Sequence, residues 1–255
     1  MTTSQRLVIF FFSVKQRIIW DYPCSNPKQL SRTKRSEKRS LVRGIQIRMI
    51  IVVIEGLSLV GKTTVCEKLI NHYKATGKRC ILCKHGHLSI DAEVDEYYRN
   101  AIQAYNRWDI PSAIEWSFFS LERDYNQFLL DGGFSQNWDI VFLDRHFTSQ
   151  HVVAEYFNIS YPLKFQRPSS HYYEFLLTSE YKALLNRARV RQDNHSRLTD
   201  YTLSSEKTHN SFDTLNKKTI LKNNPETHIL DNNDFTASRS LVNRINLLLA
   251  KEEQK

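Results

Sequence analysis

One short glycine-containing segment constrains this chain more than any other feature. GLSLVGKT at residues 56–63 follows the unbroken apolar run MIIVVIE at 49–55 and opens a helical stretch from Gly61 to about Tyr73. An unbroken β-branched run is typical of a strand buried on both faces of a parallel sheet. The segment matches G-x-x-x-x-G-K-[ST] and has a strand before it and a helix after it, the context that gives the pattern its meaning. It therefore predicts a phosphate-binding loop.

Each residue type in this loop has a physical reason. Gly56 lets the chain turn sharply off the strand, and Gly61 lets the backbone approach a phosphate with no Cβ in the way. Consecutive N–H groups then point inward, and the helix N-terminus adds partial positive charge. We expect Lys62 to contact the β- and γ-phosphates of ATP, Thr63 to ligate Mg²⁺ and Thr64 to reach an α-phosphate. The predicted ATP-binding residues are Gly56, Leu57, Ser58, Leu59, Val60, Gly61, Lys62, Thr63 and Thr64.

The rest of the chain from Met49 alternates between strand and helix patterns. Strands are predicted at 49–55, 79–84, 138–144, 172–178 and 227–230, and helices at 61–73, 91–106, 111–131, 179–191 and 236–250. Alternation of this kind predicts an α/β fold, a parallel sheet covered by helices on both faces. Ligands bind beyond the carboxyl ends of the strands in such sheets.

Charged residues stand at these strand ends. Asp144 and Arg145 end the third strand in FLDRH, and Glu55 ends the first. Asp144 is expected to hold the water shell of Mg²⁺ or to take a proton from the acceptor, and Glu55 to serve the same metal. Arg145 is expected to bind an acceptor phosphate bidentately. The alternative for Asp144 and Arg145 is a surface ion pair.

A second group of arginines follows the fourth strand. NRARVRQDNHSRL contains Arg187, Arg189, Arg191 and Arg197, and the first and third of these share a helix face. The segment predicts a small lid at about 187–204, with Arg187, Arg191 and Arg197 closing on the phosphates. The alternative is a solvated basic helix face.

The net charge of +9 belongs to the first 48 residues. They hold 11 Lys and Arg against 2 Asp and Glu, which equals the net charge of the whole 255-residue chain. The rest of the chain, residues 49–255, has no net charge. This argues against nucleic-acid binding, because a nucleic-acid-binding protein usually carries its positive patch on the folded surface. We expect residues 1–48 to be a disordered leader outside a domain at 49–255. A mitochondrial-type targeting peptide and sequence upstream of a true start at Met49 remain as alternatives.

Apolar runs and cysteines point to a cytoplasmic protein. The longest apolar run, at about 7–14, is far below the ~20 residues needed to cross a bilayer, so no membrane association is expected. Four cysteines are too few for a disulfide framework and are expected to be reduced thiols. A metal site of Cys80 and Cys83 with His85 and His87 is the alternative.

With these residues in view, the chain from about Met49 to Leu249 resembles the thymidylate kinase-like branch of nucleotide kinases. IEG followed by GKTT resembles the family's first strand and phosphate loop, LDRHFTS its Asp-Arg-Tyr segment, and RARVR with Arg197 its lid. FFSLERD resembles the helix in which a Phe stacks on thymine and an Arg contacts the base. The resemblance implies a P-loop kinase fold with a five-stranded parallel sheet, ATP and Mg²⁺ as cofactors, dTMP as acceptor and a homodimer. It implies Phe119, Arg123, Lys84 and Ser149 as acceptor-binding residues.

The chain departs from this family where the acceptor base binds. Lys84, His85 and Gly86 stand in place of Arg-Glu-Pro, and His146 in place of the Tyr of Asp-Arg-Tyr. Val152, Val153 and Ala154 stand in place of the base-lining Ala-Tyr-Gln, with Tyr156 displaced. The phosphate loop carries no arginine, so the lid is expected to supply that charge.

Three function hypotheses remain at this stage. The first is a nucleoside monophosphate kinase similar to thymidylate kinase, with a deoxynucleoside kinase as its alternative. The second is an ATP-binding protein without kinase activity, which the altered acceptor pocket motivates. The third, a nucleic-acid-binding regulator, rests on the basic leader alone.

Overall fold

The structure is a computed structural model of the chain. It describes residues 49–84, 87–89, 91–131, 138–161, 171–191, 196–223, 227–234 and 236–253. The predicted leader at 1–48 lies outside the described residues, as do His85 and Gly86.

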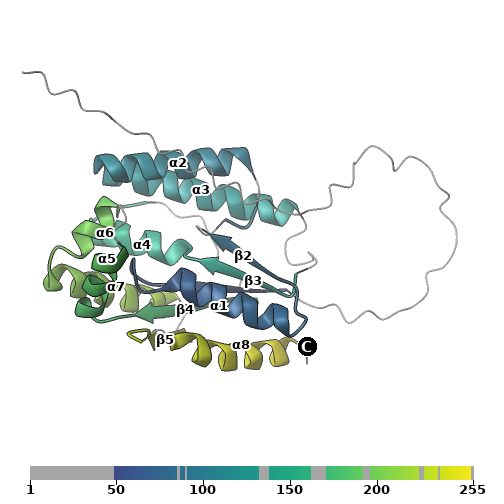
Figure 1. Ribbon diagram of the computed structural model, residues 1–255. Coiled ribbons are helices and arrows are strands. Elements are labelled where there is room, and N and C mark those ends of the chain that lie inside the picture. The colour runs from purple at the N-terminus through teal and green to yellow at the C-terminus, as the bar shows by residue number, and fades with distance from the viewer. Residues whose placement is uncertain are drawn as a thin grey trace, which may run out of the picture. The chain divides into compact units, whose positions relative to one another are not determined.

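A five-stranded parallel sheet forms the centre of the described domain (Figure 1). Its strands lie in the order β2-β3-β1-β4-β5, and every neighbouring pair is parallel. The strands are β1 (Ile50–Glu55), β2 (Cys80–Lys84), β3 (Ile140–Asp144), β4 (Tyr172–Thr178) and β5 (His228–Asp231). The predicted α/β class is confirmed, and the five strands match the predicted segments to within two residues at each end.

Side chains of β1 point alternately into two cores, which explains why the strand has no polar face. Ile50, Val52 and Ile54 pack in one cluster with apolar residues of α1 (Lys62–Ala75) and α8 (Ala237–Glu253). Met49, Ile51 and Val53 pack in a second cluster that includes Phe128. All six β1 residues are buried, so helices cover the sheet on both faces, as a parallel sheet requires.

The predicted helices are present, and three further helices were not predicted. α2 (Ala92–Arg107), α3 (Ile110–Leu130) and α5 (Tyr181–Arg191) lie in predicted segments, as do α1 and α8. The helices that the sequence did not indicate are α4 (Phe147–Tyr156), α6 (Arg197–Thr202) and α7 (Glu206–Asn223). The predicted lid at 187–204 comprises the end of α5 and α6, with 192–195 outside the described residues.

Two further features bear on the sequence expectations. No helix in the described part of the chain is long and apolar enough to cross a membrane. Cys66, Cys80 and Cys83 are buried thiols without disulfide partners, and burial raises the pKa of Cys80 to about 11 and of Cys83 to about 12.

Candidate active site

The segment 56–63 forms a tight loop between β1 and α1. Gly56, Leu59 and Gly61 have φ angles of 138°, 67° and 94°, in the region that favours glycine. A Cβ on Gly56 would lie 2.4 Å from the carbonyl oxygen of Leu177, so no other residue fits there. Helix α1 begins at Lys62, and its N-cap, Gly61, offers no side-chain hydrogen bond. The first-turn N–H groups are therefore available to an anion.

Lys62 lies within this loop rather than on the surface. Its side chain is nearly buried, at 6% exposure, and its Nζ donates to the carbonyl oxygen of Leu57 at 2.7 Å. Burial, followed by the charge of Arg145, lowers the pKa of Lys62 to about 7, while Asp144 and Glu55 act in the opposite direction. A bound phosphate group would favour the charged ammonium, because it supplies negative charge at short range.

Thr63 and Asp144 meet at the carboxyl ends of β1 and β3. The Thr63 hydroxyl donates a hydrogen bond to the carboxylate of Asp144. In the sheet, Asp144 stands beside Ile54 on one side and Lys84 on the other, so the end of β3 presents it to the phosphate loop. A hydroxyl and a carboxylate are oxygen ligands of the kind that Mg²⁺ takes. Among the described residues, no group of three or more His, Cys, Asp or Glu could hold a metal ion.

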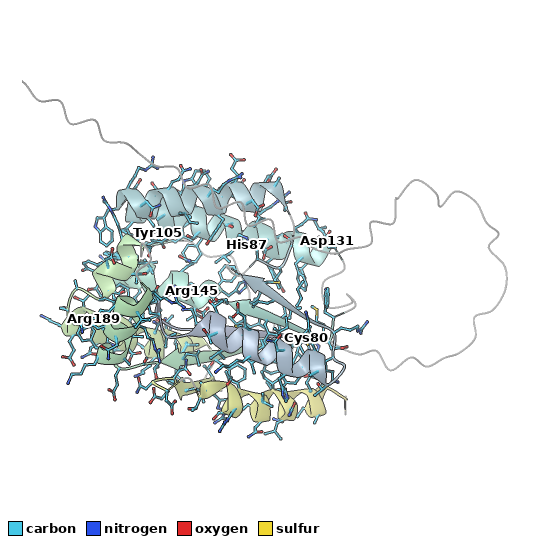
Figure 2. The ribbon with its side chains drawn as sticks, in the orientation of Figure 1. Cys80, His87, Tyr105, Asp131, Arg145 and Arg189 are labelled. Atoms are coloured by element: carbon cyan, nitrogen blue, oxygen red, sulfur yellow. The ribbon has the colours of Figure 1, made fainter. Side chains whose placement is uncertain are left out.

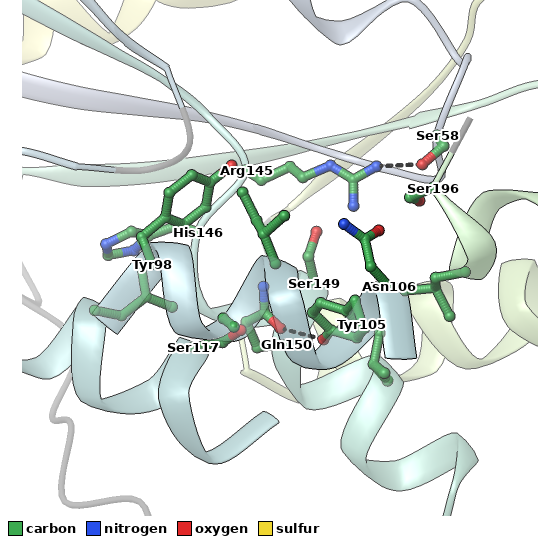
Figure 3. A pocket seen from close by; sticks show the side chains of 15 residues that line it. Ser58, Tyr98, Tyr105, Asn106, Ser117, Arg145, His146, Ser149, Gln150 and Ser196 are labelled. Atoms are coloured by element: carbon green, nitrogen blue, oxygen red, sulfur yellow. Dashed lines mark hydrogen bonds between the residues drawn. The ribbon is translucent and has the colours of Figure 1, made fainter. Parts of the chain in front are cut away.

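Arg145 follows Asp144 in a strained conformation that aims it at the loop. Its φ is 72°, which is uncommon for a residue with a Cβ. Its backbone N–H donates to the carbonyl oxygen of Ile54 at 3.1 Å. Its Nη2 donates to the Ser58 hydroxyl at 2.9 Å (Figure 3). Backbone strain held by surrounding bonds is characteristic of functional sites.

Glu55 anchors the turn that carries Arg145. It is completely buried; one carboxylate oxygen accepts from the backbone N–H of His146 at 2.8 Å and the other from the Ser149 hydroxyl. Burial raises the pKa of Glu55 despite these bonds. Because both of its oxygens are engaged by protein donors, the geometry does not favour the metal-ligand role that the sequence suggested for Glu55.

His146 occupies the position where the resembling family carries Tyr. It is buried, and its Nδ1 lies 2.5 Å from the hydroxyl of Tyr172. Burial lowers the pKa of His146 to about 3, and the neighbouring His87 contributes in the same direction. The imidazole is therefore neutral at physiological pH, and it lines the cavity described below as an uncharged ring.

Arg187 and Asn232 hold the outer side of the phosphate loop. The Arg187 guanidinium donates to the carbonyl oxygens of Leu59 (3.2 Å), Asn232 and Asn233 (2.8 Å). The Asn232 amide donates to the carbonyl oxygen of Val60 at 2.7 Å. The sequence predicted Arg187 as a lid arginine, whereas the structure has it joined to the loop backbone. Arg191 and Arg197 are exposed, and Figure 2 shows Arg189 at the edge of the molecule, with Arg145 further inside.

A cavity of about 380 Å³ adjoins the phosphate loop. Ser58 of the loop lines it, together with Arg145, which donates to Ser58, and with His146 and Ser149 (Figure 3). The remaining lining comes from α2, α3, α4, α6 and the N-cap of α6, and it includes Tyr98, Tyr105, Ser117, Gln150 and Ser196.

The structure does not bring Phe119 and Arg123 into this cavity. Phe119 is 39% exposed and lies against Tyr97 and Trp116 on α2 and α3. The Arg123 guanidinium pairs with the carboxylates of Asp91 (3.3 Å) and Glu93 (3.3 Å). On α3 the cavity-lining positions are Ser117 and Leu121, two residues before each predicted one. Lys84 ends β2 beside Asp144, and its side chain lies outside the described set.

Several residues of the site were not expected from the sequence. Tyr105 lies in a predicted helix without any motif, and Gln150 directly follows the LDRHFTS segment. Their contact becomes visible only when α2 and α4 are in place. Asn232 could have been noticed, because the run DNND after a predicted strand is typical of a turn that caps the next helix. Its side-chain oxygen indeed accepts from the N–H of Ala237, the first residue of α8.

Comparisons with known proteins give a fold likeness and nothing closer. No protein-family model matches the chain, and no curated protein matches it either. A similar solved structure is the YorR protein of Bacillus subtilis, in complex with phosphorylated GDP. Its TM-score is 0.47 and its sequence identity 19%, over 80% of this chain and 98% of that chain. We draw no functional conclusion from a likeness at this level.

Proposed function

We propose that this chain is an ATP- and Mg²⁺-dependent phosphotransferase that acts on a nucleoside monophosphate. One observation carries the proposal: Ser58 and Arg145 belong both to the neighbourhood of the phosphate loop and to the lining of the 380 Å³ cavity. A donor triphosphate in the loop and an acceptor in the cavity would therefore meet at Arg145.

ATP binds with its phosphates in the loop 56–63. The loop amides and the α1 N-terminus surround the β-phosphate, and the Lys62 ammonium neutralises charge on the β- and γ-phosphates. Thr63 and Asp144 would hold Mg²⁺, which would offset the charge that develops during transfer. An oxygen of the acceptor phosphate bonds to the γ-phosphorus, the bond from that phosphorus to the β-phosphate oxygen breaks, and ADP leaves.

Arg145 is the reason to favour a monophosphate over a nucleoside as acceptor. Its side chain donates a hydrogen bond to the neutral hydroxyl of Ser58, and no salt bridge to Arg145 occurs among the described residues. Its charge is therefore available to an anionic ligand, and a guanidinium suits a phosphate with two parallel hydrogen bonds.

The test is a panel of acceptors with purified full-length protein, ATP and Mg²⁺, followed by detection of ADP and of the phosphorylated product. We expect turnover with one or more monophosphates and its loss in Lys62→Ala. Turnover with nucleosides alone would make the chain a deoxynucleoside or nucleoside kinase. ATP binding by calorimetry without turnover on any acceptor would leave a nucleotide-binding protein that is not a kinase.

A further inference from the structure

The cavity contains a polar pair that the phosphate chemistry does not use. The hydroxyl of Tyr105, on α2, donates a hydrogen bond to the side-chain oxygen of Gln150, on α4, at 3.0 Å. Both residues line the cavity, and both are partly buried. The bond joins two helices that the sequence separates by some forty residues, so it forms only in the folded chain.

This bond fixes which end of the Gln150 amide faces a ligand. Because Oε1 accepts from Tyr105, the amide nitrogen is turned away from Tyr105, as Figure 3 shows. Burial raises the pKa of Tyr105 to about 12, so the phenol keeps its proton at neutral pH and stays the donor. The neighbouring Ser117 hydroxyl donates to the carbonyl oxygen of Ala113 at 2.7 Å. With the Tyr105 and Ser117 hydroxyls engaged in these bonds, the amide N–H groups of Gln150 are donors that the cavity offers beside Tyr105, in addition to the amide of Asn106 elsewhere in its lining.

The pair stands apart from the phosphate end of the cavity. In Figure 3, Arg145 and Ser58 lie along one side, and Gln150 and Tyr105 lie along the other. A nucleotide has the same polarity, since its 5′-phosphate and the outer edge of its base are at opposite ends. An acceptor with its phosphate at Arg145 therefore extends the outer edge of its base toward Gln150.

We propose that Gln150, oriented by Tyr105, selects acceptors whose base carries a carbonyl oxygen rather than an amino group at the outer edge, at C4 of a pyrimidine or C6 of a purine. The inference rests on the proposed function, in which the acceptor occupies this cavity. The Gln150 N–H donates to such a carbonyl. An amino group at the same position would bring two donors together, the Gln150 N–H and the N–H of the base. Both would lack an acceptor, which costs free energy in a partly enclosed site. Uracil, thymine, guanine and hypoxanthine carry the carbonyl, whereas cytosine and adenine carry the amine.

The experiment compares acceptors that differ at this position. Uridine and cytidine form one pair and inosine and adenosine the other, each tested as nucleoside and as monophosphate, in ribo and deoxy forms. For each pair, kcat/KM and the calorimetric Kd are measured with the full chain. We expect the carbonyl member of a pair to be preferred by about tenfold or more.

Substitutions then separate recognition from folding. Gln150→Glu places an acceptor where the amide donor was and should shift the preference toward the amino member. Gln150→Met removes the hydrogen bond and should abolish the preference. Tyr105→Phe frees the amide to rotate and should reduce the preference while thermal unfolding stays cooperative. Gln103→Glu makes the same chemical change at an exposed position of α2 and should leave the preference unaltered.

The outcomes distinguish this inference from the proposed function. Absence of turnover with every acceptor would defeat the kinase proposal. The calorimetric preference within each pair would still test whether Gln150 selects acceptors with a carbonyl oxygen. Equal binding of both members by the wild-type protein would overturn this inference. A carbonyl preference that persists in both Gln150→Glu and Gln150→Met would overturn it as well.

Discussion

The hydroxyl of Thr63, in the first turn of α1, donates a hydrogen bond to the carboxylate of Asp144, the last residue of β3. The two residues are 81 positions apart in the chain, and the parallel pairing of β1 with β3 brings them together. Thr63 and Asp144 are both partly exposed, so burial alone does not fix the position of the hydroxyl or of the carboxylate. The pair therefore lies at the carboxyl ends of β1 and β3, where the loop at 56–63 ends.

Replacement of Asp144 by Asn should greatly lower turnover and leave the fold intact. Asn keeps the shape and can still accept from Thr63, but it loses the charge that a metal requires. We expect kcat to fall by roughly 100-fold or more, with little change in the unfolding midpoint. Steady-state kinetics and thermal unfolding of the variant measure the two effects.

The matched control lies at the other end of the same strand. Asp139 precedes β3 and pairs with Arg79 at 3.0 Å, far along the strand from the loop. Asp139→Asn should alter stability and leave kcat nearly unchanged. An unfolded Asp144→Asn protein, or one with wild-type kcat, would remove Asp144 from the chemistry.

Nucleotide binding should take up a proton near Lys62. The pKa of this lysine is lowered to about 7 by burial, so above that pH most of the free protein carries a neutral amine. A bound triphosphate favours the ammonium and raises the pKa. Binding at pH 8 is therefore expected to consume up to one proton, and ATP affinity should fall as pH rises through and above 7.

Calorimetry in buffers with different ionisation enthalpies measures that proton directly. The uptake should disappear in Lys62→Met, which removes the titrating group at similar length. Proton release, or an unchanged uptake in the methionine variant, would assign the titration to another group.

Removal of the Glu55 carboxylate should loosen the turn that carries Arg145. In Glu55→Ala, the His146 N–H and the Ser149 hydroxyl lose their acceptor in a buried place. We expect a loss of about 2–4 kcal/mol in the free energy of unfolding, together with a lower kcat. Glu55→Gln, which retains one carbonyl acceptor, should cost less.

Urea unfolding of the two variants measures these changes. Glu96→Ala, at an exposed position of α2, is the control and should be indistinguishable from wild type. Wild-type stability in Glu55→Ala would show that the 145–149 turn is held by other contacts.

The sequence predicted the sheet well because its signals are local. An apolar run such as 49–55 is typical of a strand buried on both faces of a parallel sheet, and the loop after it has the spacing of a phosphate-binding motif between a strand and a helix. The sequence did not indicate α7, because its buried face contains His209, Asn216 and Thr219 beside Phe212 and Ile220. These positions have helical spacing, but polar residues on the buried side conceal the hydrophobic pattern.

Candidate site residues could be predicted where they lie next to a strand or in the loop motif. They could not be predicted where they lie between two packed helices. Lys62 and Thr63 begin α1 after the loop that follows β1, and Asp144 and Arg145 lie at the end of β3, where the topology gathers them. The contact of Gln150 instead depends on which residue of α2 faces it. The packing of α2 against α4 decides this, and no local sequence pattern indicates it. The sequence did not indicate the contacts of Arg187 for the same reason, since Leu59, Asn232 and Asn233 are distant from it in the chain.

Arg187 and Arg191 offer a way to separate loop support from lid chemistry. Arg187 donates to three carbonyl oxygens, those of Leu59, Asn232 and Asn233, whereas Arg191 is exposed at the end of α5. Arg187→Ala leaves those partly buried carbonyls without their donor, so we expect a loss of about 1–3 kcal/mol in the free energy of unfolding and weaker ATP binding. Arg187→Lys should recover only part of this loss, because an ammonium cannot reproduce the two parallel hydrogen bonds of a guanidinium.

Arg191→Ala should unfold like wild type and lower kcat alone, as expected of an arginine that reaches the phosphates when the lid closes. Urea unfolding, ATP calorimetry and steady-state kinetics of the three variants test the distinction, and equal stability of Arg187→Ala and wild type would contradict it.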